Sequence, residues 1–254
     1  MKTQINTAGL STERILTSTT REAIRLLNGK KDINHLDIGS GNGELIRLIK
    51  ANIQTISSAC DYTEDLMELD GQKVDVCDLN FDSLPYLDDT FDLITFTEVI
   101  EHIENHRRIL REISRILKID GVLVLSTPNL LNLKSRVRFL LCGFWNLFGP
   151  LKFGGRCIES TGGHINPIHF FYIAHSIIES GMKIESETYD KFQSTSMFYY
   201  IFLFPIIKIY SYFHIQNEKN KWGTIDNNNE QFVKKMNQSQ QLLSRTIIIS
   251  SRKT

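Results

Sequence analysis

His35-Leu-Asp-Ile-Gly-Ser-Gly-Asn-Gly-Glu44 is the stretch that decides the fold. An apolar run over residues 33–38 predicts a buried strand, and Gly39, Gly41 and Gly43 then lead into a segment with helical spacing of apolar residues. Glycine tolerates positive φ and leaves the backbone bare, while the start of a helix offers free N–H donors. The stretch therefore predicts a strand, a glycine turn and a helix whose N-terminus faces a nucleoside-like ligand.

Outward from this turn, short apolar runs alternate with segments of helical period, the pattern of βα units in a parallel sheet. Strands are expected at residues 33–38, 54–60, 73–77, 91–96, 122–126, 182–189 and 245–251, and helices at 44–53 and 106–117. Gly121 is expected to close the second helix as its left-handed residue. The fold class is therefore α/β: a doubly wound, Rossmann-like sheet in a three-layer α/β/α arrangement.

The domain organisation follows from what lies outside these units. We expect residues 1–254 to form one domain, with an aromatic lid on the acceptor side at about 130–160 and an insertion at about 191–243 before the last strand. A polar, Asn- and Gln-rich stretch over 216–241 is typical of a surface loop.

Composition excludes several classes of protein. Lys+Arg and Asp+Glu are equal at 29 each and 41% of the 254 residues are hydrophobic, so the chain is neither disordered nor a general binder of polyanions. Four cysteines form no CxxC pair, which is typical of reduced thiols. The first 24 residues lack the apolar stretch of a secretory signal, and no run of eighteen uncharged apolar residues occurs. We expect a cytoplasmic protein without a full membrane span and without a nucleic-acid partner.

Carboxylates are expected beside the glycine turn. Asp37 ends the first strand, Asp61 follows the second and Asp78 follows the third, so all three should reach one edge of the sheet. A pyrophosphate is disfavoured here because Asp37 and Glu44 flank the loop. Residues 61–104 contain fourteen acidic residues and one basic residue, which favours a cationic ligand such as a sulfonium.

The order of these motifs resembles that of class I S-adenosylmethionine-dependent methyltransferases: LDIGSGNGE, Asp61, CDLN, LPYLDDTFDLITFTEVIEHI and GVLVLSTPN. The resemblance implies a seven-stranded sheet with an antiparallel last strand and S-adenosyl-L-methionine as cofactor. It also implies that the amino acid part of the cofactor lies against Asp37, Gly39, Ser40, Gly41 and Gly43. Asp61 would take the ribose hydroxyls, Asp78 with Leu79 would cap the adenine, and Thr97 with Glu98 would line the floor under the methionine part. Tyr62, next to Asp61, is also expected to bind the cofactor.

Methyl transfer from a sulfonium mainly requires alignment, and a general base matters when the nucleophile is a hydroxyl. Candidates for that base are His102, in EVIEHIENH, and His164 or His169, in GGHINPIHFFY. We expect Glu98 and His102 to lie nearest the transferred methyl, with His164 as a further catalytic residue. A non-catalytic scaffold that retains only the cofactor site is the alternative.

The EVIEH segment carries a second alternative. Glu98, Glu101 and His102 would share one helical face, in reach of a single ion. The segment resembles both the ubiquinone-pathway O-methyltransferases and the small-RNA 2′-O-methyltransferases, in which these positions and a downstream histidine hold a divalent metal. Because the chain lacks an evident RNA-binding module, we assign no metal, and the metal-dependent RNA enzyme stays an alternative.

Two aromatic-rich segments, 130–155 and 197–213, lie outside the predicted strands and helices. They suit a homodimer contact, an apolar acceptor or a peripheral contact with the inner face of a membrane. The overall sequence pattern, including TPNLLNLKSRVRFLL and GHINPIHF, also resembles bacterial methyltransferases of surface-polysaccharide pathways. We therefore expect O-methylation of a small-molecule or lipid-linked acceptor.

Overall fold

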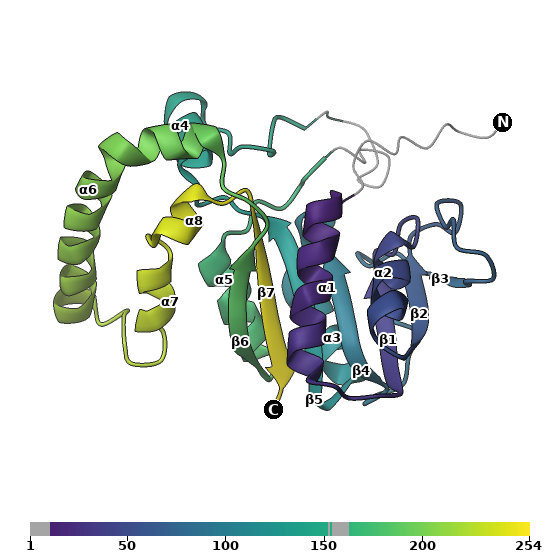
Figure 1. The fold of residues 1–254 in the computed structure, drawn as a ribbon. Coiled ribbons are helices and arrows are strands. Elements are labelled where there is room, and N and C mark those ends of the chain that lie inside the picture. Colours follow the sequence, from purple (N-terminus) through teal and green to yellow (C-terminus); the bar gives the residue numbers. More distant parts are fainter. Residues whose placement is uncertain (1–10, 152, 154–162) are drawn as a thin grey trace.

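The computed structural model describes residues 11–151, 153 and 163–254 (Figure 1). Its strands are β1 (Ile33–Ile38), β2 (Thr55–Asp61), β3 (Val74–Val76), β4 (Phe91–Thr97), β5 (Leu117–Pro128), β6 (Met182–Tyr189) and β7 (Thr246–Lys253). Its helices are α1 (Glu13–Leu27), α2 (Glu44–Asn52), η1 (Ile100–His102), α3 (His106–Ile116), α4 (Leu133–Cys142), α5 (Phe170–Glu179), α6 (Ser194–Asn217), η2 (Glu218–Trp222), α7 (Glu230–Lys235) and α8 (Ser239–Leu243).

The seven strands form one sheet in the order β3-β2-β1-β4-β5-β7-β6. Strands β1 to β5 pair in parallel, and β7 runs antiparallel to both β5 and β6. The expected sheet with an antiparallel last strand is therefore confirmed. Its parallel strands bring the ends of β1, β2 and β4 to one edge, where the candidate ligand residues lie.

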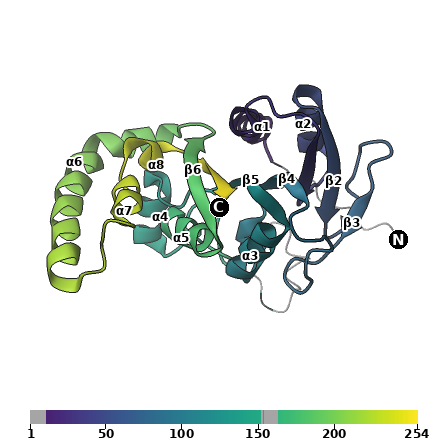
Figure 2. The same cartoon turned by 90° about the horizontal axis from the view of Figure 1, so that it is seen from below.

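Side chains alternate between two cores because successive strand residues point to opposite faces of a sheet. Ile94 and Phe96 of β4 pack in the cluster that includes α3 and α5, whereas Leu93 packs in the cluster that includes α1 and α2. Figure 2 shows these helix pairs on opposite sides of the sheet. The three-layer arrangement is thus a consequence of the two-residue period.

Two local expectations were wrong or incomplete. Helix α3 ends at Ile116, and Gly121 lies inside β5 instead of closing the helix. The left-handed residue of this turn is Asp120, with φ of 62°. Helix α1 was not predicted at all, although Ile15, Leu16 and Ala23 are buried against the sheet.

The segment at 191–243 is largely helical, whereas the described part of 130–160 contains one helix, α4, followed by a loop. Residues 152 and 154–160 of the expected lid lie outside the described residues. The polar 216–241 stretch, expected as a surface loop, contains η2, α7 and the start of α8. Figure 2 shows α6 at the end of the molecule opposite β3.

Candidate functional site

All three glycines of the turn between β1 and α2 have positive φ, and at Gly39 and Gly43 the surroundings also leave no room for a side chain. Gly39 and Gly43 have φ of 75° and 84°, in the left-handed region. A Cβ on Gly39 would lie 2.2 Å from Val99 Cγ2, and one on Gly43 would lie 2.7 Å from Met67 Sδ. The turn therefore requires glycine both for its backbone conformation and for the space around it.

Asp61 ties the turn to the end of β2. Its Oδ2 accepts a hydrogen bond from Gly41 N at 2.8 Å, and its Oδ1 accepts one from Tyr62 N at 2.7 Å. Burial raises the pKa of Asp61, and these N–H groups act in the opposite direction. A carboxylate offers about four acceptor sites. Each oxygen therefore keeps a lone pair for a further donor, such as a ribose hydroxyl.

Asp37 is a buried carboxyl at the end of β1. Its Oδ1 accepts a hydrogen bond from Thr95 Oγ1 at 2.7 Å, and Thr95 Oγ1 lies 2.9 Å from His35 Nε2. Burial raises the pKa of Asp37 to about 8, and the charge of Asp61 adds to this effect although the Thr95 hydrogen bond opposes it. Asp37 is therefore largely neutral at pH 7 until a cation approaches it.

A cavity of about 170 Å³ lies over the turn. Its lining includes Asp37, Gly39 and Gly41, together with Ser40 and Thr97. The buried hydroxyl oxygens Ser40 Oγ and Thr97 Oγ1 have no hydrogen-bond partner among the residues that the structure describes. Unpartnered buried polar atoms that face a cavity suit a polar ligand. The site therefore fits the amino acid part of S-adenosylmethionine.

The N-terminal segment adds residues that the sequence did not indicate. Ser11, Glu13 and Leu16 also line the cavity. They come from α1 and the two residues before it, which cover the turn from the same side as α2 (Figure 1). The helical spacing of Ile15, Leu16 and Ala23 was the one signal in the sequence that could have placed them.

Six predicted cofactor residues do not line this cavity: Gly43, Asp61, Tyr62, Asp78, Leu79 and Glu98. Gly43 belongs to the glycine turn, and Asp61 is joined to the lining through its hydrogen bond from Gly41 N. Tyr62 follows β2 and is 41% exposed. Asp78 follows β3, where its Oδ1 accepts a hydrogen bond from Asn80 N, and Leu79 beside it is buried. The contacts of Tyr62, Asp78 and Leu79 with ribose and adenine therefore stay predictions.

Glu98 does not share a helical face with Glu101 and His102. Its φ of 55° places it in the left-handed region, and η1 begins only at Ile100. Its Oε1 accepts a hydrogen bond from Ser126 Oγ at 3.1 Å. Because i, i+3 and i+4 residues meet only along a continuous helix, the left-handed turn removes Glu98 from the predicted group.

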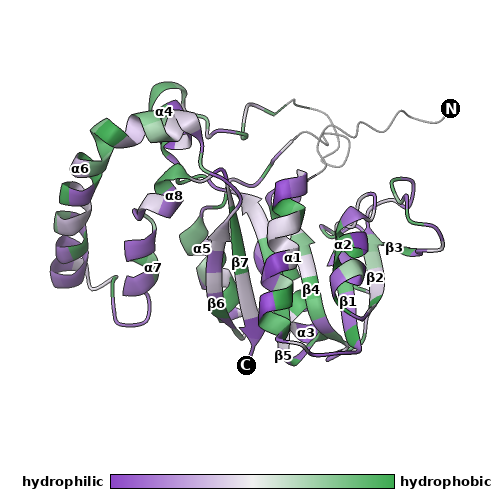
Figure 3. Cartoon of the chain, in the orientation of Figure 1, coloured by the Kyte–Doolittle hydropathy of each residue, from purple (hydrophilic) through white to green (hydrophobic). Residues whose placement is uncertain are grey.

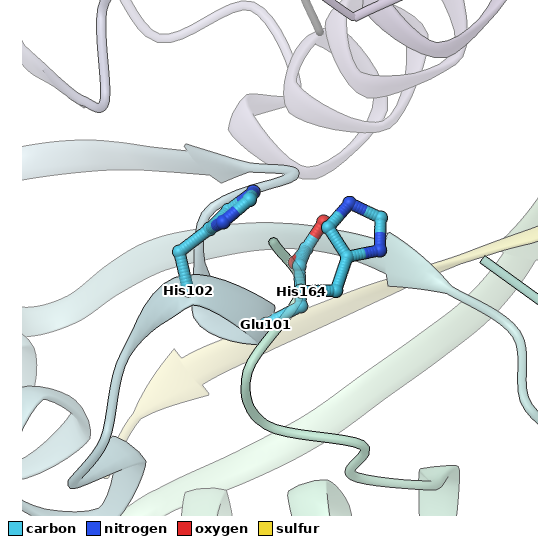
Figure 4. Close-up of side chains that lie close together, drawn as sticks. All are labelled: Glu101, His102 and His164. Atoms are coloured by element: carbon cyan, nitrogen blue, oxygen red, sulfur yellow. The ribbon is translucent and has the colours of Figure 1, made fainter. Parts of the chain in front are cut away.

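A different group of three side chains does meet. Ligand atoms of Glu101, His102 and His164 all lie within 4.8 Å of one another. The three side chains extend to the same side of the backbone (Figure 4). Ile165 N and Asn166 N both donate to Glu101 O at 3.0 Å, which holds the loop of His164 against η1. The structure thus brings together two predicted catalytic histidines and a glutamate from the metal alternative.

The hydrogen bonds of this cluster define its chemistry. His102 Nδ1 lies 3.2 Å from Gly163 O, and since a carbonyl only accepts, this nitrogen carries the proton. Nε2 is then free to accept a proton or to bind an ion. Burial lowers the pKa of His102, and it lowers that of His164 to about 4, so both are neutral at pH 7.

Two atoms of the cluster remain without partners. Glu101 Oε2 accepts a hydrogen bond from Thr127 Oγ1, whereas Glu101 Oε1 and His164 Nδ1 are buried without a partner in the described part of the chain. Burial, then the charge of Glu98, raises the pKa of Glu101. A substrate hydroxyl or a divalent ion would satisfy both atoms.

His169 lies apart from this cluster. It precedes α5, and its ring packs against Tyr172 with centroids 4.6 Å apart. Burial lowers its pKa to about 4, and Arg136 adds to this effect. His169 is therefore a packing residue at the start of α5, and His102 and His164 remain as the candidates for the base.

Comparisons with known proteins agree with this architecture. Residues 13–177 match the family model described as "Methyltransferase domain". A probable S-adenosylmethionine-dependent methyltransferase from Mycobacterium tuberculosis is 33% identical over 97 residues, 37% of this chain and 35% of that protein. Demethylmenaquinone methyltransferase from Listeria welshimeri is 26% identical over 123 residues, 43% of this chain and 52% of that protein. The matched part is thus about half or less of these relatives.

A solved structure supports the fold over nearly the whole chain. The crystal structure of a SAM dependent methyltransferase from Archaeoglobus fulgidus superposes with a TM-score of 0.55 and 19% identity, and covers 94% of each chain. At this identity the likeness concerns the fold alone.

Proposed function

We propose, because this chain belongs to the methyltransferase-domain family, that it transfers a methyl group from S-adenosylmethionine to a hydroxyl of a small or lipid-linked acceptor. The observation that carries the cofactor assignment is the Asp61 carboxylate, held by Gly41 N and Tyr62 N beside a cavity with two unpartnered hydroxyls. When bound, S-adenosylmethionine supplies a methyl group on a positively charged sulfur.

The chain's own residues would then bind the cofactor, align the acceptor and remove the proton from its hydroxyl. Asp61 would accept hydrogen bonds from ribose hydroxyls, and Asp37 would face the ammonium group. His102 is proposed as the general base, because its Nδ1 donates to Gly163 O and leaves Nε2 as the acceptor of the hydroxyl proton. Glu101 and His164 would orient the acceptor through their unpartnered atoms.

Asp61→Ala tests the cofactor assignment. We expect titration calorimetry to show weaker binding of S-adenosylmethionine and S-adenosylhomocysteine by about 1–3 kcal/mol, through loss of charge-assisted hydrogen bonds. Asp70→Ala, at an exposed position after β2, is the control for loss of one negative charge. Equal affinities of the Asp61→Ala and wild-type proteins would remove Asp61 from the site.

Acceptor class is tested with methyl-labelled donor. Cell extract is divided into aqueous metabolites, organic-extractable lipids and RNA, and His102→Ala serves as the comparison for base catalysis. Label in the first two fractions that depends on His102 supports the proposal. Label confined to RNA assigns the alternative RNA activity, and cofactor binding without transfer to any fraction assigns the scaffold.

A metal-dependent form of the reaction is the second candidate. One observation favours it: the donor atoms of Glu101, His102 and His164 are close enough to share one ion. His102 also donates its other ring N–H to a carbonyl, as metal-bound histidines do. Calorimetric titration of the protein with Mg²⁺, Mn²⁺ and Zn²⁺, and of Glu101→Gln in parallel, tests it. Binding by the wild type alone supports a metal.

A further inference from the structure

We propose that α6, with the exposed part of α4 and the adjoining loop, forms an apolar surface that inserts into one leaflet of an anionic lipid bilayer. This apolar surface comprises α6, residues 139–142 of α4 and the loop at 144–151. The assignment is independent of cofactor binding. It deepens the proposed function in one respect, since it identifies the acceptor as an amphiphile, and only that part rests on methyl transfer.

The first observation is the exposure of α6. The continuous helix Ser194–Trp222 has the length and composition of a membrane-crossing helix, and no part of its most apolar stretch is buried. Ile201, Phe202 and Tyr210 are 70%, 63% and 72% exposed. Figure 3 shows apolar residues in the part of α6 nearer α4 and more polar residues toward its C-terminal end. The apolar residues of α6 are not confined to one face. A helix that is apolar nearly all round belongs either in a core or in lipid, and this helix is in no core.

The second observation is that α4 extends the same surface. Lys134 N, at the start of α4, donates to Ser196 Oγ of α6 at 3.2 Å, which places the two helices side by side. Leu140 and Leu141 are 81% and 78% exposed. The loop that follows adds the exposed side chains of Phe144, Leu147 and Leu151. Exposed apolar side chains therefore occur on two neighbouring helices, and monomeric soluble proteins rarely expose large apolar patches.

Charge identifies the occupant as an anionic bilayer and not a second copy of the chain. Residues 130–151 and 191–217 contain five Lys and Arg and no Asp or Glu. Lys134 and Lys208 are exposed among the apolar side chains. Two copies facing each other would bring like charges together, whereas lysines next to inserted side chains attract anionic headgroups. Tyr212 and Trp222, both exposed, carry rings that suit the bilayer interface.

Tertiary contacts favour an α6 that lies along the membrane surface over one that crosses the bilayer. Tyr200 Oη and Ser239 Oγ are 2.8 Å apart, Asn237 Nδ2 donates to Ser211 Oγ at 2.6 Å, and Lys219 pairs with Glu230 at 2.6 Å. These bonds hold α6 to the α7–α8 segment from one end to the other. A spanning helix would carry these polar groups into hydrocarbon at high cost.

The apolar surface also borders the ligand edge of the sheet. Helix α4 follows the end of β5, and α6 follows the end of β6. These ends lie at the same edge as the glycine turn, since β1, β5 and β6 all run in one direction. An amphiphile held in the leaflet would thus present its headgroup to the site.

Vesicle flotation with the full chain tests the proposal. Vesicles are phosphatidylcholine alone or phosphatidylcholine with one quarter phosphatidylglycerol, and no cofactor is added. We expect wild-type protein to float with both kinds of vesicle and more strongly with the anionic ones. Salt at 1 M should remove this difference, because it screens the lysines, and should leave the binding that inserted apolar side chains provide. The double substitution Ile201→Asp and Ile209→Asp should weaken vesicle binding by more than about tenfold, because two exposed apolar anchors are lost.

The matched control is the double substitution Leu87→Asp and Ile119→Asp, which changes two exposed apolar residues away from α6 and should float like the wild type. Circular dichroism and a cooperative thermal unfolding transition confirm that each variant is folded. Failure of the wild type to float, or equal loss in both double variants, overturns the proposal. A wild-type dimer that the α6 substitutions dissociate, without vesicle binding, assigns the surface to a second copy. If the protein floats with vesicles but the methyl label of the acceptor experiment enters only aqueous metabolites, the membrane surface stands and only the assignment of an amphiphilic acceptor is overturned.

Discussion

Asp37 shows how one buried residue can couple cofactor binding to pH. Its carboxyl is buried and accepts a hydrogen bond from Thr95 Oγ1, which in turn lies 2.9 Å from His35 Nε2. Burial raises its pKa to about 8, so it holds a proton at neutral pH. A cationic amino group placed beside it would favour the carboxylate.

We therefore predict that binding of S-adenosylmethionine at pH 6.5 releases about one proton. Affinity should rise with pH by up to about tenfold per unit, and level off near pH 8, because the carboxylate is the binding form. Calorimetry in buffers of different ionisation enthalpy measures the proton count. Asp37→Asn should bind without this proton release, and an enthalpy that is independent of buffer in the wild type would contradict the role.

At the same scale, the three-residue cluster shows what the sequence could and could not predict. His102 and His164 were expected near the methyl group, and their proximity to each other is a finding of the structure. Glu101, and not Glu98, lies with the two histidines, because the left-handed backbone at Glu98 interrupts the helical spacing that would have placed Glu98 beside them. Nothing in a linear pattern indicates that one residue will adopt positive φ where no glycine stands.

The strand–turn–helix element was the most predictable part of the molecule. Its apolar run, its glycines and its helix start are all local signals, and β1 has the predicted bounds. The reason each glycine is needed is not local, since Val99 and Met67 come from other segments. Sequence thus predicted the turn, whereas its tight packing required tertiary structure.

We predict that Gly39→Ala will destabilise this element by more than backbone strain alone. A left-handed alanine costs about 1–2 kcal/mol, and the added Cβ would also displace Val99. Gly29→Ala is the matched control, because Gly29 has φ of 79° and nothing within 4 Å of an added Cβ. Denaturant unfolding should show a larger loss for Gly39→Ala. Equal losses would mean that the contact with Val99 relaxes freely.

Over the whole molecule, charge is divided between two ends. The acidic 61–104 segment runs through β3 and β4, whereas the basic apolar surface of α4 and α6 lies at the end of the molecule opposite β3 (Figure 2). The overall balance of 29 positive and 29 negative side chains conceals this separation. The electrostatic potential therefore differs between the two ends of the protein: the acidic end should attract cations and the basic end anions.

This separation predicts that the cofactor before and after methyl transfer will bind with different dependence on salt. S-adenosylmethionine carries a sulfonium charge that S-adenosylhomocysteine lacks, so its affinity should fall more steeply as salt rises from about 0.05 to 1 M. Calorimetric titration of both ligands over this range gives the two slopes. Parallel slopes would show that the acidic segment is only a solvated face.

The position of β7 has a consequence for how the chain is made. Strand β6 joins the sheet only through β7, which arrives more than fifty residues later. During translation, β6 therefore has no strand partner until the ribosome has completed α6 to α8. In the same interval, the isoleucine and phenylalanine side chains of α6 are exposed. The nascent protein would reach a lipid surface or a chaperone before its sheet is closed.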